Sequence, residues 1–238
     1  MNKINLEEER DFENRKVYGE KIRDKQDKYY WSVQIPIKKH NKVLLEKIKG
    51  KNILEIGCSI GKEAKYYVDY CSIYCGIDIS DAAIKKANSL KLKNSEFLCT
   101  DGHKIPKEDM VFDCVVVNSL LHHLELEKSL KEIYRVLKPK GLLIFREPLG
   151  TNPFFQIYRK FTPNARTLTE RPFTIGDIKI MKKYFILREV QWFGFLSIIS
   201  AFFSSYFFMR FLTSIDYLLS KTFIKIFFWQ FSGFAEKK

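Results

Sequence analysis

The stretch Asn52-Ile-Leu-Glu-Ile-Gly-Cys-Ser-Ile-Gly61 decides the fold of this chain. Its first five residues have the length and apolarity of a buried strand, and they run directly into a turn of small residues. Gly57 and Gly61 let a ligand approach the backbone, and the amide groups at the start of the following helix point toward it. Because Ser59 stands where the dinucleotide fingerprint requires a further glycine, the pattern argues against a nicotinamide or flavin site.

Strand-length apolar runs alternate with helical stretches from this segment to about residue 147. Runs that are apolar on both faces and separated by helices are typical of a parallel sheet covered on both sides. Two runs end in carboxylates, Asp78 and Asp101, so these side chains are expected at the same edge of the sheet as the glycine turn. The predicted strands are 52–56, 72–77, 96–99, 113–118 and 142–146, and the predicted helices are 61–70, 80–90 with Ser80 as N-cap, and 125–137.

Taken in order, these motifs resemble the class I S-adenosylmethionine-dependent methyltransferases. The resemblance covers residues 52–147 and rests on Glu55-Ile-Gly-Cys-Ser-Ile-Gly61, Asp78, Asp101-Gly102, Phe112-Asp-Cys-Val-Val-Val-Asn-Ser-Leu-Leu-His-His-Leu124 and Arg135-Val-Leu-Lys-Pro-Lys-Gly-Leu-Leu-Ile-Phe145. It implies an α/β fold, a Rossmann-like, mostly parallel sheet of seven strands with helices on both faces. One reversed C-terminal strand, placed at 224–235, would lie between the fifth strand and a sixth at 186–195. The resemblance also implies an enzyme with S-adenosyl-L-methionine as cofactor.

The resemblance assigns cofactor-binding roles position by position. Glu55 would orient the amino group of the methionine moiety, and Asp78 would bind the ribose hydroxyls. Asp101 would bind the adenine amino group, and Asn118 would face the sulfonium. The remaining members of the expected cofactor site are Gly57, Cys58, Ser59, Gly61, Ile79, Gly102 and His103.

His122 and His123 follow the fourth predicted strand, on the side where the family places its substrate. An imidazole accepts a proton near neutral pH, so either histidine is a candidate base, although a purely structural hydrogen bond is the competing interpretation. No cluster of carboxylates accompanies them, so no metal site is expected.

A polar stretch with several prolines, residues 148–175, follows Glu147. Glu147, Arg159 and Arg166 are expected to hold a polar or anionic group of the substrate over the methyl donor, Glu147 being counted with the catalytic residues. The competing interpretation is a solvated loop with internal salt bridges.

The two ends of the chain differ from its centre. Residues 1–51 are rich in charge and are predicted to form a helical cap over a methyltransferase domain of residues 52–238. Residues 196–222 are predicted to form two apolar helices interrupted near 210–216, serving as a lid, a membrane contact or a homodimer interface, with ordinary core packing as the alternative. The uncharged stretch 190–209 approaches the length of a membrane span, but its serines, Gln191 and Gly194 dilute its apolarity.

The net charge of +13 is compatible with a nucleic acid, an anionic membrane or an anionic substrate. The residues Asn118-Ser-Leu-Leu121 lack the aromatic signature of many nucleic-acid methyltransferases, so an RNA substrate is the second choice, and a noncatalytic binding module is the third. An odd number of cysteines and a start without an apolar segment suggest a reduced, cytoplasmic protein, peripheral to a membrane if residues 196–222 touch one. The favoured function is O-methylation of a small-molecule, saccharide-linked or lipid-linked acceptor.

Overall fold

A computed structural model describes residues 5–19, 27–161, 167 and 171–238. Its centre is a seven-stranded sheet with the order β3-β2-β1-β4-β5-β7-β6. The strands are β1 (Asn52–Ile56), β2 (Ile73–Asp78), β3 (Ser95–Cys99), β4 (Phe112–Asn118), β5 (Leu137–Pro148), β6 (Phe185–Phe193) and β7 (Gln230–Lys237). β7 runs antiparallel to both β5 and β6. The predicted fold, including the reversed strand between the fifth and sixth strands, is therefore confirmed.

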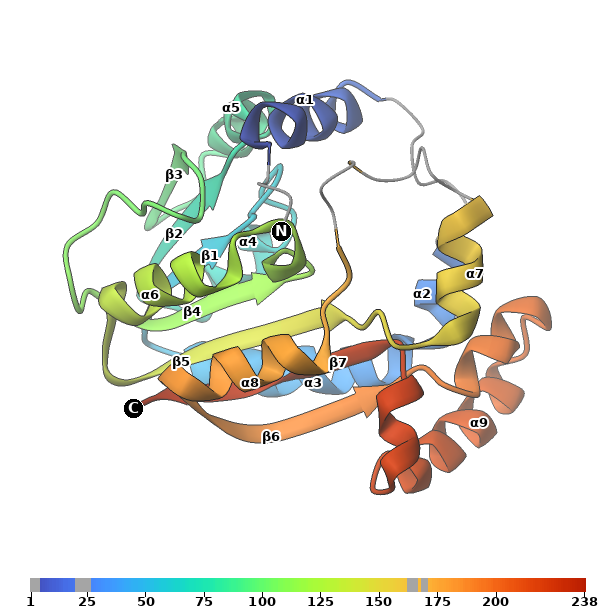
Figure 1. The fold of residues 1–238 in the computed structure, drawn as a ribbon. Coiled ribbons are helices and arrows are strands. Elements are labelled where there is room, and N and C mark those ends of the chain that lie inside the picture. The colour runs from blue at the N-terminus through green and yellow to red at the C-terminus, as the bar shows by residue number, and fades with distance from the viewer. Residues whose placement is uncertain (1–4, 20–26, 162–166, 168–170) are drawn as a thin grey trace.

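Helices cover both faces of the sheet, because each central strand is apolar on both sides (Figure 1). One face packs against α6 (Leu126–Val136) and α8 (Ile175–Tyr184), and the other against α3 (Gln34–Ile48), α4 (Ala64–Tyr67) and α5 (Asp81–Ser89). Alternation along β1 sends Ile56 to the first face and Ile53 to the second. The sheet lies between the two cores. A ligand site is expected at the carboxyl ends of its strands.

The N-terminal cap consists of α1 (Leu6–Val17), α2 (Asp27–Ser32) and α3. Asn5 caps α1 by accepting backbone N–H groups of Glu7 and Glu8. α1 lies beside α5 at one end of the sheet, whereas α2 lies near α7 (Pro153–Phe161) at the other (Figure 1). Within the predicted 148–175 loop, residues 153–161 are thus helical. Residue 159 lies on α7, and Arg166 lies outside the described residues.

The C-terminal region differs from its prediction in two places. The segments η3 (Ser197–Phe202) and α9 (Tyr206–Leu219) are separated at residues 203–205, and α9 runs without interruption through 210–216. Asp216, which marked the expected break, is buried and accepts the backbone N–H groups of residues 195–197. The expected strand 224–235 begins late, because Phe223–Phe227 form the short helix η4. No helix of the described residues is long and apolar enough to cross a membrane.

Candidate functional site

A cavity of about 260 Å³ opens at the carboxyl edge of β1 to β4. This volume lies just below the range of roughly 300–1,000 Å³ that small-molecule sites occupy. Seven of the residues expected to bind cofactor line it, together with one of the two histidines: Gly57, Ser59, Asp78, Ile79, Asp101, Gly102, Asn118 and His123. The sequence therefore locates most of the wall that the sheet contributes.

Asp78 is fixed at the end of β2 by two backbone groups. Its Oδ2 accepts the N–H of Ser59 at 2.9 Å, and its Oδ1 accepts the N–H of Ser80 at 2.9 Å. Burial raises the pKa of Asp78, and the two backbone hydrogen bonds oppose that rise. Each carboxylate oxygen retains a second lone pair, so the group can accept further hydrogen bonds from a ligand.

The turn after β1 approaches the cavity closely. Gly57 has φ +79°, a conformation that side chains disfavour, and a Cβ there would lie 2.9 Å from the Leu120 side chain. Ser59 adopts φ +47°, the same left-handed region, although it carries a side chain. The turn thus keeps its shape with serine in place of the more usual glycine.

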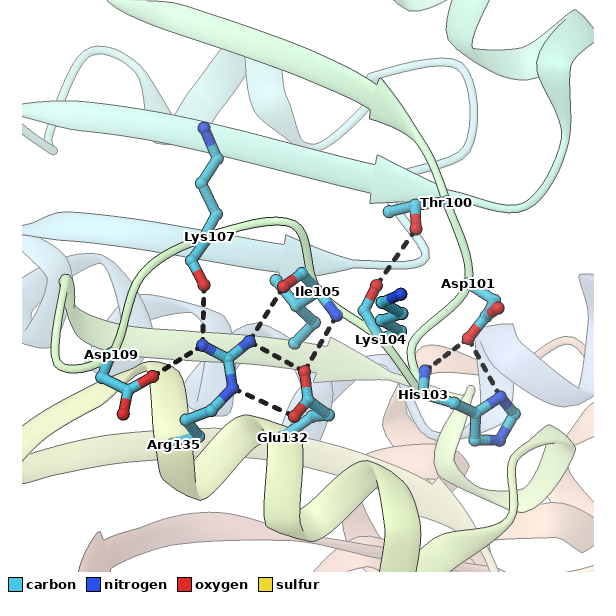
Figure 2. A network of polar contacts seen from close by, with 9 residues as sticks. All are labelled: Thr100, Asp101, His103, Lys104, Ile105, Lys107, Asp109, Glu132 and Arg135. Atoms are coloured by element: carbon cyan, nitrogen blue, oxygen red, sulfur yellow. Dashed lines mark hydrogen bonds and ion pairs between the residues drawn. The ribbon is translucent and has the colours of Figure 1, made fainter.

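Asp101 is held by a network around the connection from β3 to β4 (Figure 2). Its Oδ1 accepts the backbone N–H of His103 at 2.6 Å and lies 3.1 Å from His103 Nδ1. His103 Nε2 accepts the N–H of Glu125, so the proton of this imidazole is on Nδ1 and is donated to Asp101. Farther along the connection, all three guanidinium nitrogens of Arg135 donate hydrogen bonds, to Glu132, Asp109 and the carbonyl groups of residues 105 and 107.

Several predicted site residues do not line the cavity. Glu55 does not line the cavity, whereas its neighbour Ile56 does, because successive side chains of β1 point to opposite faces of the sheet. The Glu55 carboxylate accepts a hydrogen bond from the Tyr74 hydroxyl at 2.5 Å. Burial raises the pKa of Glu55 to about 8. His103 does not line the cavity but contacts Asp101 through its Nδ1. Cys58 and Gly61 are buried within the turn after β1.

The two neighbouring histidines have different carboxylate partners. Nδ1 of His122 lies 2.7 Å from Glu147 Oε2, while Glu147 Oε1 accepts the N–H groups of Leu120 and Leu121. Glu147 has no exposed surface, and burial raises its pKa to about 7. Neither His122 nor Glu147 is among the residues that line the cavity, and their contacts connect the turn after β4 to the end of β5.

His123 lies on the cavity wall and pairs with α1. Its Nδ1 is 3.1 Å from Glu9 Oε2, and the other oxygen of Glu9 accepts a hydrogen bond from Thr167. Glu9 is 6% exposed. This carboxylate therefore joins three segments that are far apart in the sequence at one side of the cavity.

Helix α1 supplies part of the wall that the sequence did not predict, namely Leu6, Glu9, Glu13 and Lys16. It is attached to the β2–α5 turn, where Asn14 donates to Asp81 at 2.9 Å and accepts from Ser80 at 2.6 Å. The capping asparagine and acidic first turn predict a helix start, but they carry no signal for where that helix docks.

The residues 196–222 lie near the β6 edge of the sheet, beside α2 and away from α1 (Figure 1). No described residue of this segment lines the cavity, so the structure does not place it as a lid there. Its outward side chains are strongly aromatic: Phe202, Phe203, Tyr206, Phe207, Phe211 and Tyr217 are each more than half exposed, as is Phe223 on η4. We call these seven residues the aromatic surface.

Comparison with known proteins agrees with the fold. Residues 54–145 match the methyltransferase domain family. An uncharacterized protein of Methanocaldococcus jannaschii is 31% identical over 146 residues, which is 58% of this chain and 61% of the relative. The phthiotriol/phenolphthiotriol dimycocerosates methyltransferase 1 of Mycobacterium ulcerans is 30% identical over 109 residues, 44% of this chain and 40% of the relative. The matches thus span between two fifths and about three fifths of these relatives.

Among solved structures, the N-methyltransferase NodS of Bradyrhizobium japonicum, in complex with S-adenosyl-L-homocysteine, superposes with a TM-score of 0.57 at 16% identity. The superposition covers 84% of this chain and 86% of NodS. At this identity the likeness concerns the fold. Residues 54–145 thus match the methyltransferase domain family, and the superposition shows that the chain shares the fold of a methyltransferase.

Proposed function

We propose that this chain transfers a methyl group from S-adenosylmethionine to an oxygen atom of a small-molecule, saccharide-linked or lipid-linked acceptor. The observation that carries the proposal is the cavity at the carboxyl edge of the sheet. There Asp78, Asp101 and Asn118 share one space with His123. Hydrogen-bonding groups for a nucleoside and a candidate base thus line the same cavity.

The cavity residues suit the chemistry of this cofactor. Asp78 offers a carboxylate for a ribose diol, and Asp101 offers one for an adenine amino group. A Cβ at Gly102 would lie 3.1 Å from Leu124 and 3.2 Å from Ile56, so the wall is narrow there. Oδ1 of Asn118 is buried on the wall with no hydrogen-bond partner among the described residues, and a bound ligand would supply one.

The sulfonium of the cofactor supplies an already activated methyl group, so the chain's task is to position the acceptor and exclude water. Helix α1 lines one side of the cavity and would help to keep water from the reacting atoms. A hydroxyl acceptor must lose its proton, and His123 lies where it can receive it. The Glu9 carboxylate, 3.1 Å from Nδ1, orients this imidazole.

The aromatic surface supports a lipid-like or lipid-linked acceptor and a peripheral membrane contact. Exposed apolar surfaces of this kind mark interaction sites, and basic side chains accompany it. Lys28 lies 4.8 Å from the Phe202 ring centre and Lys221 lies 4.6 Å from that of Tyr217. Aromatic side chains with adjacent lysines suit the interface of an anionic membrane. A homodimer through the same surface is the competing proposal.

The proposed function is tested by incubating the purified chain with methyl-labelled S-adenosylmethionine and separate lipid, water-soluble small-molecule and RNA fractions of cells. Label in the lipid or small-molecule fraction supports the proposal. Label in RNA would establish the nucleic-acid alternative. Binding of S-adenosylhomocysteine without any transfer would favour the noncatalytic module.

A further inference from the structure

One partly buried arginine has no counter-ion in the described part of the chain. Arg146 lies near the end of β5, and its buried Nε finds no hydrogen-bond partner there. By contrast, every guanidinium nitrogen of Arg135 donates a hydrogen bond (Figure 2), and Arg171 is paired with Asp177. A guanidinium away from bulk water is costly unless an anion accompanies it.

Polar side chains lie in register on both sides of Arg146. Asn118 of β4 is its partner in the parallel ladder, and Ser232 of β7 is its partner in the antiparallel ladder. Residues directly opposite one another share a face of the sheet, so the three side chains form one row under α3. The oxygen atoms of both neighbours, Asn118 Oδ1 and Ser232 Oγ, are buried and lack partners among the described residues.

Two further side chains with unpartnered polar atoms lie on the same face. Gln230 precedes Ser232 by two residues on β7 and is 1% exposed, and neither its amide nitrogen nor its amide oxygen has a partner in the described part of the chain. His40 of α3, also 1% exposed, stacks on Phe234 at 5.2 Å, and no described residue bonds to either of its ring nitrogens. Burial, with the nearby charge of Arg146, lowers the pKa of His40 to about 4.

The row touches the cofactor cavity at one end. Asn118 belongs both to the row and to the cavity wall, and the carbonyl of Arg146 accepts the N–H of Ser119, another wall residue, at 2.7 Å. At the other end, Ser232 pairs with Gln191 of β6, which lines a groove between α3, β6 and α9. A ligand held at Arg146 on β5 would therefore lie next to β4, which borders the cofactor cavity, and next to β7, which pairs with the strand that borders the groove.

We infer that Arg146, with Ser232, Gln230 and His40, binds an oxyanion of the methyl acceptor, a carboxylate or a phosphate, beside the cofactor cavity. The inference rests on the proposed function for the identity of its ligand, but not for the existence of the anion site. A guanidinium donates in a fork that matches either oxyanion. The serine hydroxyl, the glutamine amide and the neutral imidazole each provide a further donor.

The test uses inorganic phosphate as the probe and the full chain, with and without S-adenosylhomocysteine. The melting temperature is measured against phosphate concentration, with chloride keeping the ionic strength constant. We expect a saturable rise for the wild-type chain, no such rise for Arg146→Gln, and weaker binding by several-fold for Ser232→Ala. Arg188→Gln, which removes an arginine paired with Glu236 on the exposed edge strand, is the matched control and should retain the rise. Any general stabilisation by phosphate affects all variants equally.

Two outcomes would overturn the inference. If wild-type and Arg146→Gln chains respond to phosphate alike, phosphate does not bind at Arg146. If Arg146→Gln weakens S-adenosylhomocysteine about tenfold while leaving 5′-methylthioadenosine unchanged, the guanidinium belongs to the cofactor's own carboxylate. Failure of the wild-type chain to bind S-adenosylhomocysteine would contradict the proposed function instead, and the phosphate titration without that ligand would still decide the anion site.

Discussion

Oε2 of Glu9 lies 3.1 Å from Nδ1 of His123, and this contact joins the first described helix to the turn that follows β4. The neighbouring His122 has its own carboxylate in Glu147, which is fully buried. The two adjacent histidines thus have different carboxylate partners, and only His123 is among the residues that line the cavity.

We expect Glu9→Gln to reduce turnover by about tenfold or more while cofactor affinity changes little, because a neutral amide replaces the carboxylate that orients the His123 imidazole. Steady-state kinetics and calorimetric titration with S-adenosylhomocysteine separate the two quantities. Glu7→Gln, an exposed change in the same helical turn, is the control and should leave both unchanged. Equal kinetics for the Glu9 and Glu7 variants would contradict the role of the pair.

The two histidine variants should fail in different ways. We expect His123→Ala to lose about a hundredfold in turnover with nearly unchanged folding stability and cofactor affinity. His122→Ala should instead lower the free energy of unfolding by about 1–3 kcal/mol, because it removes the partner of a buried carboxylate. Denaturant unfolding of both variants, beside their kinetics, tests this division. A stable His122→Ala variant together with an unfolded His123→Ala variant would contradict this division, because His123 would then be the residue that stabilises the fold.

The buried acids predict how stability depends on pH. Burial raises the pKa of Glu55 to about 8 and that of Glu147 to about 7, from 4.5. Between the pKa of the unfolded acids, 4.5, and their folded values of about 7 and about 8, the folded chain retains protons that the unfolded chain has released. The free energy of unfolding should therefore fall as pH rises through this window. Glu55→Gln should make the fall shallower by up to about 1.4 kcal/mol per pH unit.

Urea unfolding at a series of pH values measures this slope, with the exposed change Glu108→Gln as control. Parallel curves for the Glu55 variant and the wild-type chain would show that Glu55 does not carry the linkage. A free energy of unfolding that does not change with pH across this window would show that both acids are already ionised in the folded chain.

The aromatic surface should direct the protein to anionic vesicles. We expect flotation with phosphatidylserine-containing liposomes, little flotation with neutral ones, and loss of binding in the double variant Phe207→Ser/Phe223→Ser, whose side chains are 82% and 78% exposed. Ile186→Ser, an exposed apolar change on β6, is the control. A chain that remains unbound but sediments as a dimer, and becomes a monomer in the double variant, would assign the surface to a homodimer.

The parts of the fold that are local in sequence could be predicted. The alternation of apolar runs and helices located β1 at its observed bounds and Ser80 as the cap of α5. These features depend on residues that are close in the sequence, and so does the turn that contains Gly57. The sequence also predicted Asp78 and Asp101 at one sheet edge, because parallel strands end there together.

Features that depend on distant contacts could not be predicted. The docking of α1 depends on Asn14 meeting Ser80 and Asp81, and no local pattern indicates it. Asp216 suggested a break in an apolar helix, yet it lies inside that helix with its carboxylate turned toward the backbone of residues 195–197. Strand alternation turned Glu55 away from the cavity, which its motif alone did not indicate.

Calorimetric titration with S-adenosylhomocysteine tests most directly whether S-adenosylmethionine binds at the carboxyl edge of β1 to β4. We expect binding by the wild-type chain and at least about tenfold weaker binding by Asp78→Ala, because two charge-assisted hydrogen bonds to the ribose are lost. Asp69→Asn, a change of an exposed aspartate outside the cavity, should bind as the wild-type chain does. Unchanged affinity in Asp78→Ala would contradict the site.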